Sequence, residues 1–223
     1  MSDTGGHGNG AVSHGSSEPL VVGLGRNGSA NVPVARSVAH EAPGVLHLAV
    51  SVQVVDVSGR WLLQRRAPTK MLFANRWANT CCTHPAPGED PAWAALRRLR
   101  QETGLVVEDL LPAGSFTYRA TDPHSHLVEN EHDFVFAAVA DVRTAEPDPE
   151  EISELALLPF EEAVELLQSA AAAPWSATVL RHCQAALGRC PLRGPPDRGP
   201  VARRGVGVAL PATGPSRKEG QRP

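Results

Sequence analysis

The stretch Val45 to Arg66, VLHLAVSVQVVDVSGRWLLQRR, predicts two β-strands joined by a tight turn. Its first half alternates with a period of two, the spacing of a strand with two distinct faces. Ser58-Gly59 is a hairpin turn signal, and RWLLQRR returns as the second strand. One face of the first strand carries an apolar series and the other a more polar one: Leu46, Leu48, Val50, Val52 and Val54 against His47, Ala49, Ser51 and Gln53.

Downstream, the chain alternates between helical and extended patterns. Asp90 is suited to cap a helix that has Pro91 at its first position, runs through AWAALRRLRQET and ends at Gly104. FTYRAT and ENEHDFVFAAVA read as strands. Two helices follow, from Pro159 to about residue 172 and from 175 to 187, separated by Pro174. This order predicts an α/β (α+β) fold, a mixed sheet with helices packed on it.

Composition divides the chain into one domain and two tails. Residues 1–31 are rich in Gly and Ser, and we expect a mostly disordered tail in which only PLVVGL could form an edge strand. Residues 188–223, rich in Pro, Gly and Arg, are expected to be disordered as well. The domain is predicted to span residues 32–187, and residues 34–187 alone are expected to keep the activity.

Charge and apolar patterning exclude several classes of protein. Residues 34–187 carry twelve Lys and Arg against twenty Asp and Glu, whereas residues 188–223 carry eight against two. Nucleic acid is not an expected partner, because a nucleic-acid site is usually a basic face of the fold rather than a Pro/Gly-rich tail. There is no apolar run of membrane-spanning length and no signal-peptide pattern. We therefore expect a cytoplasmic protein that does not enter a membrane, with free thiols.

The segment NTCCTHP, from Asn79 to Pro85, places two adjacent cysteines near a histidine. It could be a metal-binding corner, a nucleophile with its base, a disulfide or a buried turn. A bond between Cys81 and Cys82 would be strained, because adjacent side chains diverge and disulfide geometry is narrow. The residues of this segment do not decide among the other readings.

Metal-ligating side chains recur elsewhere, but no CxxC or HExxH spacing is present. Glu129 and Glu131 lie two apart on a predicted strand, so their carboxylates share one side of the sheet. Such a pair repels unless a cation or a proton lies between the two groups, although on a solvated edge it costs little. With His40, His47 and His84, these residues could form a mixed N/O site for Mn²⁺, Mg²⁺ or Zn²⁺.

Basic side chains gather around one loop and one helix of an otherwise acidic domain. Each alone is an ordinary surface residue, and Arg98 with Glu102 could simply be a solvated i,i+4 pair. Together they indicate an anionic substrate with more than one charged oxygen. The set is Arg65, Arg66, Lys70, Arg97 and Arg98.

Taken in order, the segments HLAVSV, LLQRRAPTK, WANTCCTHP, RRLRQETG, YRATDP, ENE and APW resemble the type I isopentenyl-diphosphate Δ-isomerases, which have the Nudix fold. The resemblance covers about residues 34–187. A degraded Nudix box ends at Gly104 and keeps Glu89 and Glu102. It has Thr83 in place of glycine and Arg98 and Gln101 in place of glutamates, a loss typical of the isomerase branch.

The resemblance implies a Nudix-type mixed sheet sandwiched by helices and a set of site residues. The metal ligands are His40, His47, His84, Glu129 and Glu131, holding one Mn²⁺ or Zn²⁺ per subunit. Glu102 would help hold Mg²⁺ on the substrate diphosphate. The implied catalytic residues are Cys82, Glu131 and Tyr118, and the implied substrate contacts are Arg36, Arg66, Lys70, Arg98 and Trp175.

The activity implied is the interconversion of isopentenyl and dimethylallyl diphosphate through a tertiary carbocation. We expect Glu131, with Tyr118 and the metal, to deliver one proton and the Cys82 thiolate to remove another, although the sequence leaves this order open. Two rivals stay open: a Nudix pyrophosphohydrolase of nucleotide diphosphates, and a non-catalytic metal-binding paralogue. Arg36 replaces a lysine usual in the family, and the loop before ENE is one residue longer. We expect a monomer or weak dimer with a small diphosphate substrate.

Overall fold

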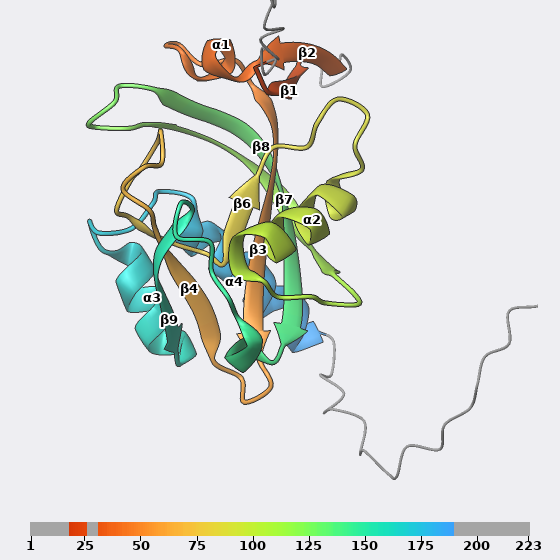
Figure 1. Cartoon of the computed structure of the whole chain (residues 1–223), viewed down its shortest axis with the longest axis vertical. Helices are drawn as coiled ribbons and strands as arrows, with labels where there is room; N and C mark the ends of the chain where they lie inside the picture. The colour runs from red at the N-terminus through yellow and green to blue at the C-terminus, as the bar shows by residue number, and fades with distance from the viewer. Residues whose placement is uncertain (1–17, 26–30, 190–223) are drawn as a thin grey trace, which may run out of the picture. The chain divides into compact units, whose positions relative to one another are not determined.

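The predicted hairpin forms the centre of the sheet. The computed structural model describes residues 18–25 and 31–189, and Figure 1 shows the arrangement of their elements. The hairpin strands are β3 (His47–Asp56) and β4 (Trp61–Arg66). The other strands of the nine-stranded sheet in this part of the chain are β1 (Leu20–Leu24), β2 (Asn31–Ala35), β5 (Trp77–Ala78), β6 (Cys81–Thr83), β7 (Leu111–Thr121), β8 (Val128–Ala140) and β9 (Ile152–Leu158).

Strand β3 is paired along both of its edges. It pairs with β8 in parallel along its whole length, starting with His47 opposite Glu131. Its other edge is shared by three antiparallel partners: β1 at the start, β6 in the middle and β4 at the end. The sheet is therefore mixed, as predicted, and the register brings residues 84 positions apart side by side.

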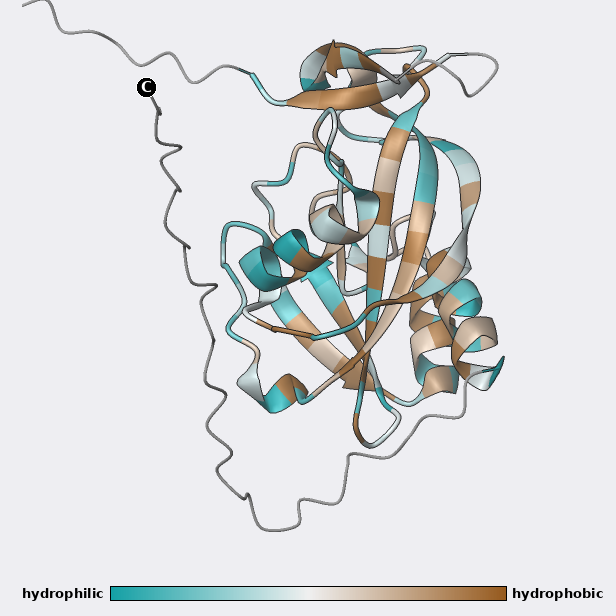
Figure 2. Cartoon of the chain, turned by 90° about the vertical axis from the view of Figure 1, so that its right-hand side faces the viewer, coloured by the Kyte–Doolittle hydropathy of each residue, from teal (hydrophilic) through white to brown (hydrophobic). Residues whose placement is uncertain are grey.

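Helices cover both faces of the sheet. Helix α2 (Pro91–Thr103) packs on one face, against Val50, Val52 and Val54. Helices α3 (Phe160–Gln168) and α4 (Ser176–Arg189) pack on the other face. Figure 1 shows α2 in front of the sheet and α4 behind it, and Figure 2 shows helices on either side of the strands. Because both faces are covered, the more polar series of β3 is also buried. The predicted fold class is confirmed.

The predicted ends of α2 are confirmed in atomic detail. The Asp90 side chain accepts hydrogen bonds from the backbone N–H groups of Ala92 (2.9 Å) and Trp93 (3.1 Å). These bonds satisfy donors that have no partner within the helix. Gly104 closes the helix with φ at 72°, a left-handed conformation in which a side chain would be strained. Within the described residues, no helix is long and apolar enough to span a membrane.

A small antiparallel pair stands at the N-terminal side of the domain. Strand β1 pairs with β2 over its whole length and with β3 through Gly23 and His47, and helix α1 (Arg36–His40) follows β2. Val21 and Val22 are 1% and 4% exposed. Strand β1 thus lies before the domain start expected at residue 32. The expected tails over residues 1–17 and 190–223 lie outside the described residues.

We expect deletion of residues 1–33 to destabilise the protein and deletion of residues 1–17 to leave its stability unchanged. The first result would run against the composition-based expectation that residues 34–187 alone keep the activity. Deleting residues 1–33 removes β1 and part of β2, and the loss of two buried valines should cost on the order of 3 kcal/mol in unfolding free energy. Deleting residues 1–17 leaves both strands intact and should leave stability and bound metal close to those of the full chain. Thermal unfolding and elemental analysis of both variants check this, and equal stability of the two would contradict it.

Candidate metal centre and active-site cavity

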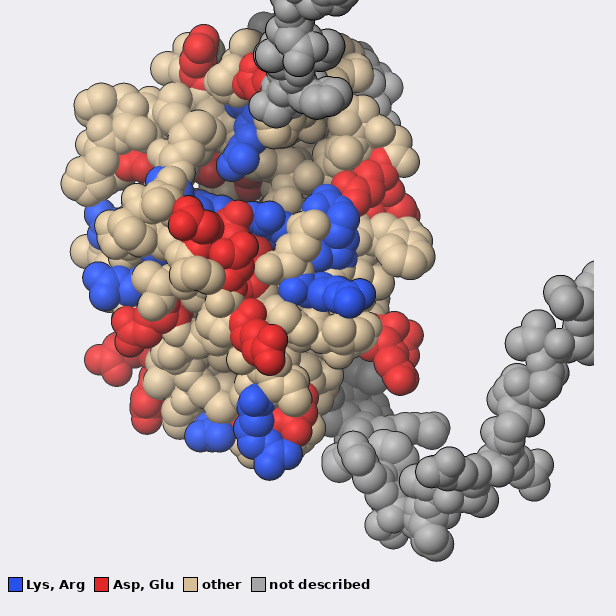
Figure 3. Space-filling view, viewed as in Figure 1, with Lys and Arg blue, Asp and Glu red and all other residues tan. Residues whose placement is uncertain are grey.

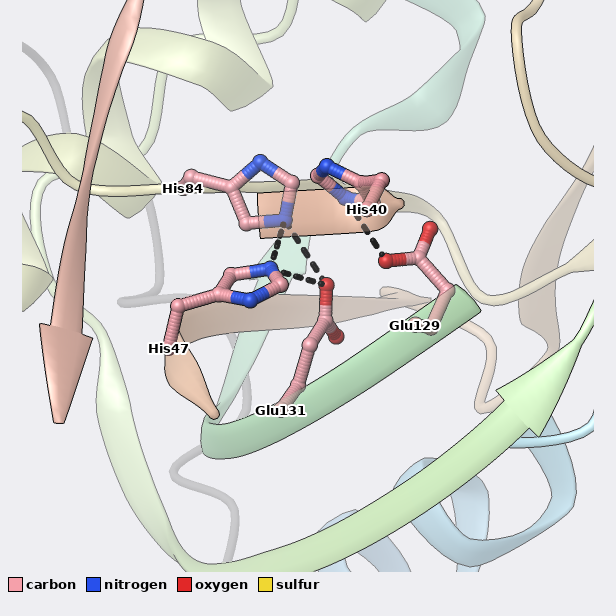
Figure 4. A group of neighbouring side chains, drawn as sticks. All are labelled: His40, His47, His84, Glu129 and Glu131. Carbon is pink, nitrogen blue, oxygen red and sulfur yellow. Dashed lines mark hydrogen bonds and ion pairs between the residues drawn. The ribbon is translucent and has the colours of Figure 1, made fainter. Parts of the chain in front are cut away.

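Five side chains from four separate segments converge on one point. His40 ends α1, His47 begins β3, His84 follows β6, and Glu129 and Glu131 lie on β8. One ligand atom from each lies within 4.8 Å of all the others, and four of the five residues are buried. Figure 4 shows the rings and carboxylates pointing toward one another. The sheet makes this possible, because alternate residues of β8 face the same side and the parallel register sets His47 beside Glu131.

The contacts within the cluster show which nitrogens face its centre. His84 Nε2 lies 2.7 Å from a Glu131 oxygen and 3.2 Å from His47 Nε2, and His40 Nε2 lies 3.0 Å from a Glu129 oxygen. The Nδ1 atoms of His40 and His47 each lie 2.7 Å from a backbone carbonyl, which can only accept. Both rings therefore carry a proton on Nδ1, and Nε2 of each faces the centre of the cluster as the nitrogen available to a metal ion.

Electrostatics also favour a cation in this cluster. Burial, followed by the charge of Glu131, raises the pKa of Glu129. Burial alone would raise the pKa of Glu131, but hydrogen bonds from His47 and His84 outweigh it and lower that pKa well below its usual range. Burial lowers the pKa of His84 to about 4, so this ring is neutral at pH 7. Burial alone would lower the pKa of His40, but the hydrogen bond and the charge of Glu129 outweigh it and raise that pKa. Imidazole nitrogens beside adjacent carboxylates fit a divalent metal ion.

A cavity of about 450 Å³ adjoins the cluster. That volume suits a small ligand. Its walls combine reactive, apolar and cationic side chains, and the predicted site residues Arg36, Arg66, Lys70, Cys82, His84, Arg98, Tyr118, Glu129, Glu131 and Trp175 all line it.

The two adjacent cysteines have different surroundings. Cys82 lines the cavity, whereas Cys81 is 1% exposed and packs in the apolar core beneath α2. Residues next to each other on a strand face opposite sides, and here one side is the cavity and the other is the core. Burial, followed by the charge of Asp133, raises the pKa of Cys82 to about 12. At neutral pH this group is therefore a thiol in the free protein, rather than the expected thiolate.

A second acid–base group, Tyr118 paired with Glu131, also lines the cavity. The Tyr118 hydroxyl donates a hydrogen bond to Glu131 Oε2 at 2.5 Å. Burial, together with the charge of Glu131, raises the pKa of Tyr118 well above its usual range, so the phenol keeps its proton. The Trp175 ring lies 5.7 Å from the Tyr118 ring and 5.2 Å from Phe73. A protonated hydroxyl and an aromatic wall thus meet beside the metal cluster.

The other end of the cavity is cationic. Arg66 hydrogen-bonds the Leu72 carbonyl and lies 5.6 Å from the centre of the Trp175 ring. The buried Nε of Arg36 has no hydrogen-bond partner in the described part of the chain. Blue side chains cross the middle of the face drawn in Figure 3, with acidic ones among them. Such a set of fixed cations suits a ligand with several charged oxygens.

Glu102 lies behind these cations. It is 2% exposed and is not part of the cavity wall. Its carboxylate accepts hydrogen bonds from Arg98 Nε (2.6 Å) and Gln64 Nε2 (3.3 Å), and burial raises its pKa. Its expected part in holding Mg²⁺ therefore requires access past Arg98, which separates it from the cavity.

Sequence reasoning missed Glu151 as a member of the site. Its carboxylate lines the cavity and pairs with both Lys70 and Arg98, the latter at 2.6 Å. Nothing in the sequence distinguishes it from its neighbour Glu150, because only the folded chain brings it next to Lys70. Arg97 also lines the cavity and pairs with Glu89 at 2.7 Å.

Comparison with known proteins identifies the family. A model of the NUDIX domain matches residues 45–183. An isopentenyl-diphosphate Delta-isomerase of Streptomyces griseus is 43% identical over 175 residues, covering 78% of this chain and 87% of that one. Another from Nocardia farcinica is 46% identical over 156 residues, covering 69% and 87%. The chain belongs to the isopentenyl-diphosphate Delta-isomerase family. The resemblance stated from the motifs is therefore confirmed.

Solved structures agree on the fold of this isomerase-family chain. The crystal structure of DR0079 from Deinococcus radiodurans has a TM-score of 0.56 at 20% identity, covering 74% of this chain and 98% of that one. A MutT protein from Methanosarcina mazei has a TM-score of 0.50 at 19% identity, covering 63% and 94%. At these identities the likeness shows the Nudix fold and nothing about activity.

Proposed function

We propose that this protein interconverts isopentenyl diphosphate and dimethylallyl diphosphate by moving a proton onto one carbon and another off a second carbon. One observation carries the proposal. A single cavity brings the Cys82 thiol and the Tyr118–Glu131 pair next to the face of Trp175, with cations at its other end. This is the set of groups that a diphosphate-anchored double-bond shift requires.

The cations anchor the substrate in this proposal. Arg36, Arg66, Lys70 and Arg98 line the cavity and would hold the diphosphate. Glu102 would help hold its Mg²⁺ only where the ion has access past Arg98, because Glu102 is buried behind that side chain. Arg36 supplies a planar, always charged group that can contact two oxygens at once. Anchoring the charged end fixes the distance to the reactive end, so the five-carbon chain lies against Trp175 and between the two proton-transfer groups.

The two acid–base groups share the proton transfers. The terminal carbon of isopentenyl diphosphate gains a proton, C3 becomes a tertiary carbocation, and C2 then loses a proton. In the free protein both Cys82 and Tyr118 hold a proton, while the low pKa of Glu131 leaves its carboxylate ionised. When the Cys82 thiol delivers its proton, the ionised Glu131 carboxylate can take the proton from C2. Delivery from the Tyr118–Glu131 side instead requires Cys82 to enter the turnover as a thiolate that takes the C2 proton. In the reverse reaction the two sides exchange these roles.

The walls of the cavity protect the cation. The face of Trp175 stabilises positive charge through its π electrons. Leu72, 2% exposed, and Trp175, 4% exposed, are both buried wall residues that exclude water, which would otherwise quench the carbocation.

The metal cluster supports one side of this chemistry. A Mn²⁺ or Zn²⁺ held by His40, His47, His84, Glu129 and Glu131 would neutralise the paired carboxylates and tune the acidity of Glu131. Independently of the ion, Tyr118 fixes the second oxygen of Glu131 through its hydrogen bond, which leaves this carboxylate in one orientation.

The site is less well suited to pyrophosphate hydrolysis. Arg98 and Gln101 replace two box carboxylates, and Glu89, which the box keeps, is engaged by Arg97 through two hydrogen bonds of 2.7 and 3.0 Å. Glu102 is left as a single buried carboxylate beside Arg98. A hydrolase that uses several carboxylate-bound metal ions would lack ligands here.

The test is to incubate the purified protein and Mg²⁺ with isopentenyl diphosphate and with a panel of nucleotide diphosphates. Dimethylallyl diphosphate formed without phosphate release supports the proposal. Phosphate released from nucleotides would support the hydrolase instead, and no reaction with any compound would support a non-catalytic metal-binding protein. We also propose that the protein is cytoplasmic and is a monomer or weak dimer, and size-exclusion chromatography of the same sample checks the oligomeric state.

A further inference from the structure

Asn79 is a fully buried polar residue that touches both the reactive thiol and the aromatic wall. It lies between β5 and β6, just before the two cysteines, and is 0% exposed. A buried amide is tolerated when its donors and acceptor are satisfied. Every polar atom of the Asn79 side chain has a partner.

The contacts of Asn79 determine how its amide is oriented. Its Nδ2 lies 2.9 Å from the Cys81 carbonyl and 3.2 Å from the Val52 carbonyl, which can only accept hydrogen bonds. Its Oδ1 lies 3.1 Å from Nε1 of Trp175, which can only donate. The flipped amide would lose all three bonds, so Asn79 is held in one orientation.

In that orientation the amide lies against the sulfur of Cys82. Nδ2 and Oδ1 are both 3.2 Å from Sγ. On another side, Ser51 Oγ lies 3.4 Å from the same sulfur and donates its own proton to Asp133 at 2.7 Å. Two buried polar side chains, one from β3 and one from the link between β5 and β6, therefore restrain the thiol within the cavity wall.

The bond from Trp175 restrains the aromatic wall in the same way. Rotation of the Trp175 side chain would break the bond from Nε1 to Asn79, whereas its ring contacts with Phe73 and Tyr118 are non-directional by comparison. One amide thus connects the thiol to the ring, two groups that are 93 positions apart in the chain.

We propose that Asn79 is a positioning residue that holds the Cys82 sulfur and the Trp175 ring in a fixed mutual geometry for proton transfer. It touches no substrate and acts through those two side chains. This inference rests on the proposed isomerase function for its kinetic readout only. Displacing a reacting group by about 1 Å can cost about 10²-fold in rate, so the expected effect on kcat is large.

The test compares Asn79→Ala with Gln53→Ala. Gln53 is a matched control, because it is also 0% exposed, does not line the cavity and does not contact Cys82 or Trp175; its amide donates to the carbonyls of Val54 and Leu62 and to the Thr80 hydroxyl. Both substitutions should lower the midpoint of thermal unfolding. Only Asn79→Ala should lower kcat, by about 10²-fold, with KM and metal content close to wild type. Asn79→Asp, which keeps the shape and the acceptor for Trp175, provides a second variant and should also lower kcat.

Two further readouts do not require turnover. In Asn79→Ala, iodoacetamide should alkylate Cys82 several-fold faster than in wild type, as followed by mass spectrometry. The tryptophan fluorescence spectrum of this variant should also shift. Gln53→Ala should change neither the alkylation rate nor the spectrum. An inactive wild type whose Asn79→Ala variant still shows both changes would overturn the isomerase proposal while supporting this one. Unchanged alkylation and fluorescence, or a kcat in both Asn79 variants within about threefold of Gln53→Ala, would overturn the positioning role.

Discussion

Cys82→Ala should abolish double-bond migration, whereas Cys81→Ala should keep most of it. Losing a positioned proton-transfer group costs on the order of 10² to 10⁴ in rate, and in a cavity that excludes water we expect the upper end of that range. Cys82 lines the cavity, while Cys81 is 1% exposed on the opposite side of the same strand. The measurement is the rate of formation of dimethylallyl diphosphate by each purified variant.

The rest of the site should survive the loss of the thiol. Cys82 is not in the metal cluster, and the cationic end of the cavity is formed by other side chains. Metal content and pyrophosphate binding of Cys82→Ala should therefore match wild type. For Cys81→Ala, a modest fall in thermal stability is expected, because a small buried side chain is lost from the core beneath α2.

Deuterium exchange can separate the two proton-transfer groups. A Cys82→Ala protein that still exchanges solvent deuterium into isopentenyl diphosphate fits the proposal, because Tyr118 and Glu131 can protonate the double bond alone and reversibly. Normal isomerisation by Cys82→Ala is the result that the proposal does not survive. An inactive Cys81→Ala protein with a normal Cys82→Ala counterpart would reassign the catalytic thiol.

The local features of the fold could be predicted because each depends on a few neighbouring residues. Asp90, Pro91 and Gly104 specify where α2 begins and ends, and the alternation after Val45 specifies a strand. The parallel pairing of β3 with β8 could not be derived from either strand alone, since register arises from packing both against α2 and α4. That pairing is what brings His47 to Glu131.

The site was predictable to the extent that its residues belong to recognisable motifs. Nothing local marks Glu151, and the pattern of PLVVGL indicated a possible edge strand but not that it belongs to the domain. Glu151 gains its role by meeting Lys70, 81 positions away. Strand β1 became part of the fold through its pairing with β2 and β3, because a short apolar segment is stable only when a partner covers it. The elevated pKa of Cys82 likewise depends on burial, which no motif reveals.

Removing one ligand from the His/Glu cluster should release the tightly bound metal. We expect His84→Ala and Glu129→Gln each to weaken metal affinity by at least about 100-fold, because even partners outside the ligand set are worth 10- to 100-fold. His84 lies 2.7 Å from Glu131, and Glu129 pairs with His40 at 3.0 Å, so both are central to the cluster. Elemental analysis after gel filtration measures the metal that each variant retains.

His132→Ala is the matched control for this prediction. His132 follows Glu131 directly on β8, but it points to the other side of the sheet, where it lines a separate groove with Phe134. Its loss should leave the metal content unchanged. Full metal occupancy in His84→Ala or Glu129→Gln would remove that residue from the ligand set. Release of metal from His132→Ala as well would indicate that β8 as a whole had been disturbed, and the losses in the other two variants would then no longer identify ligands.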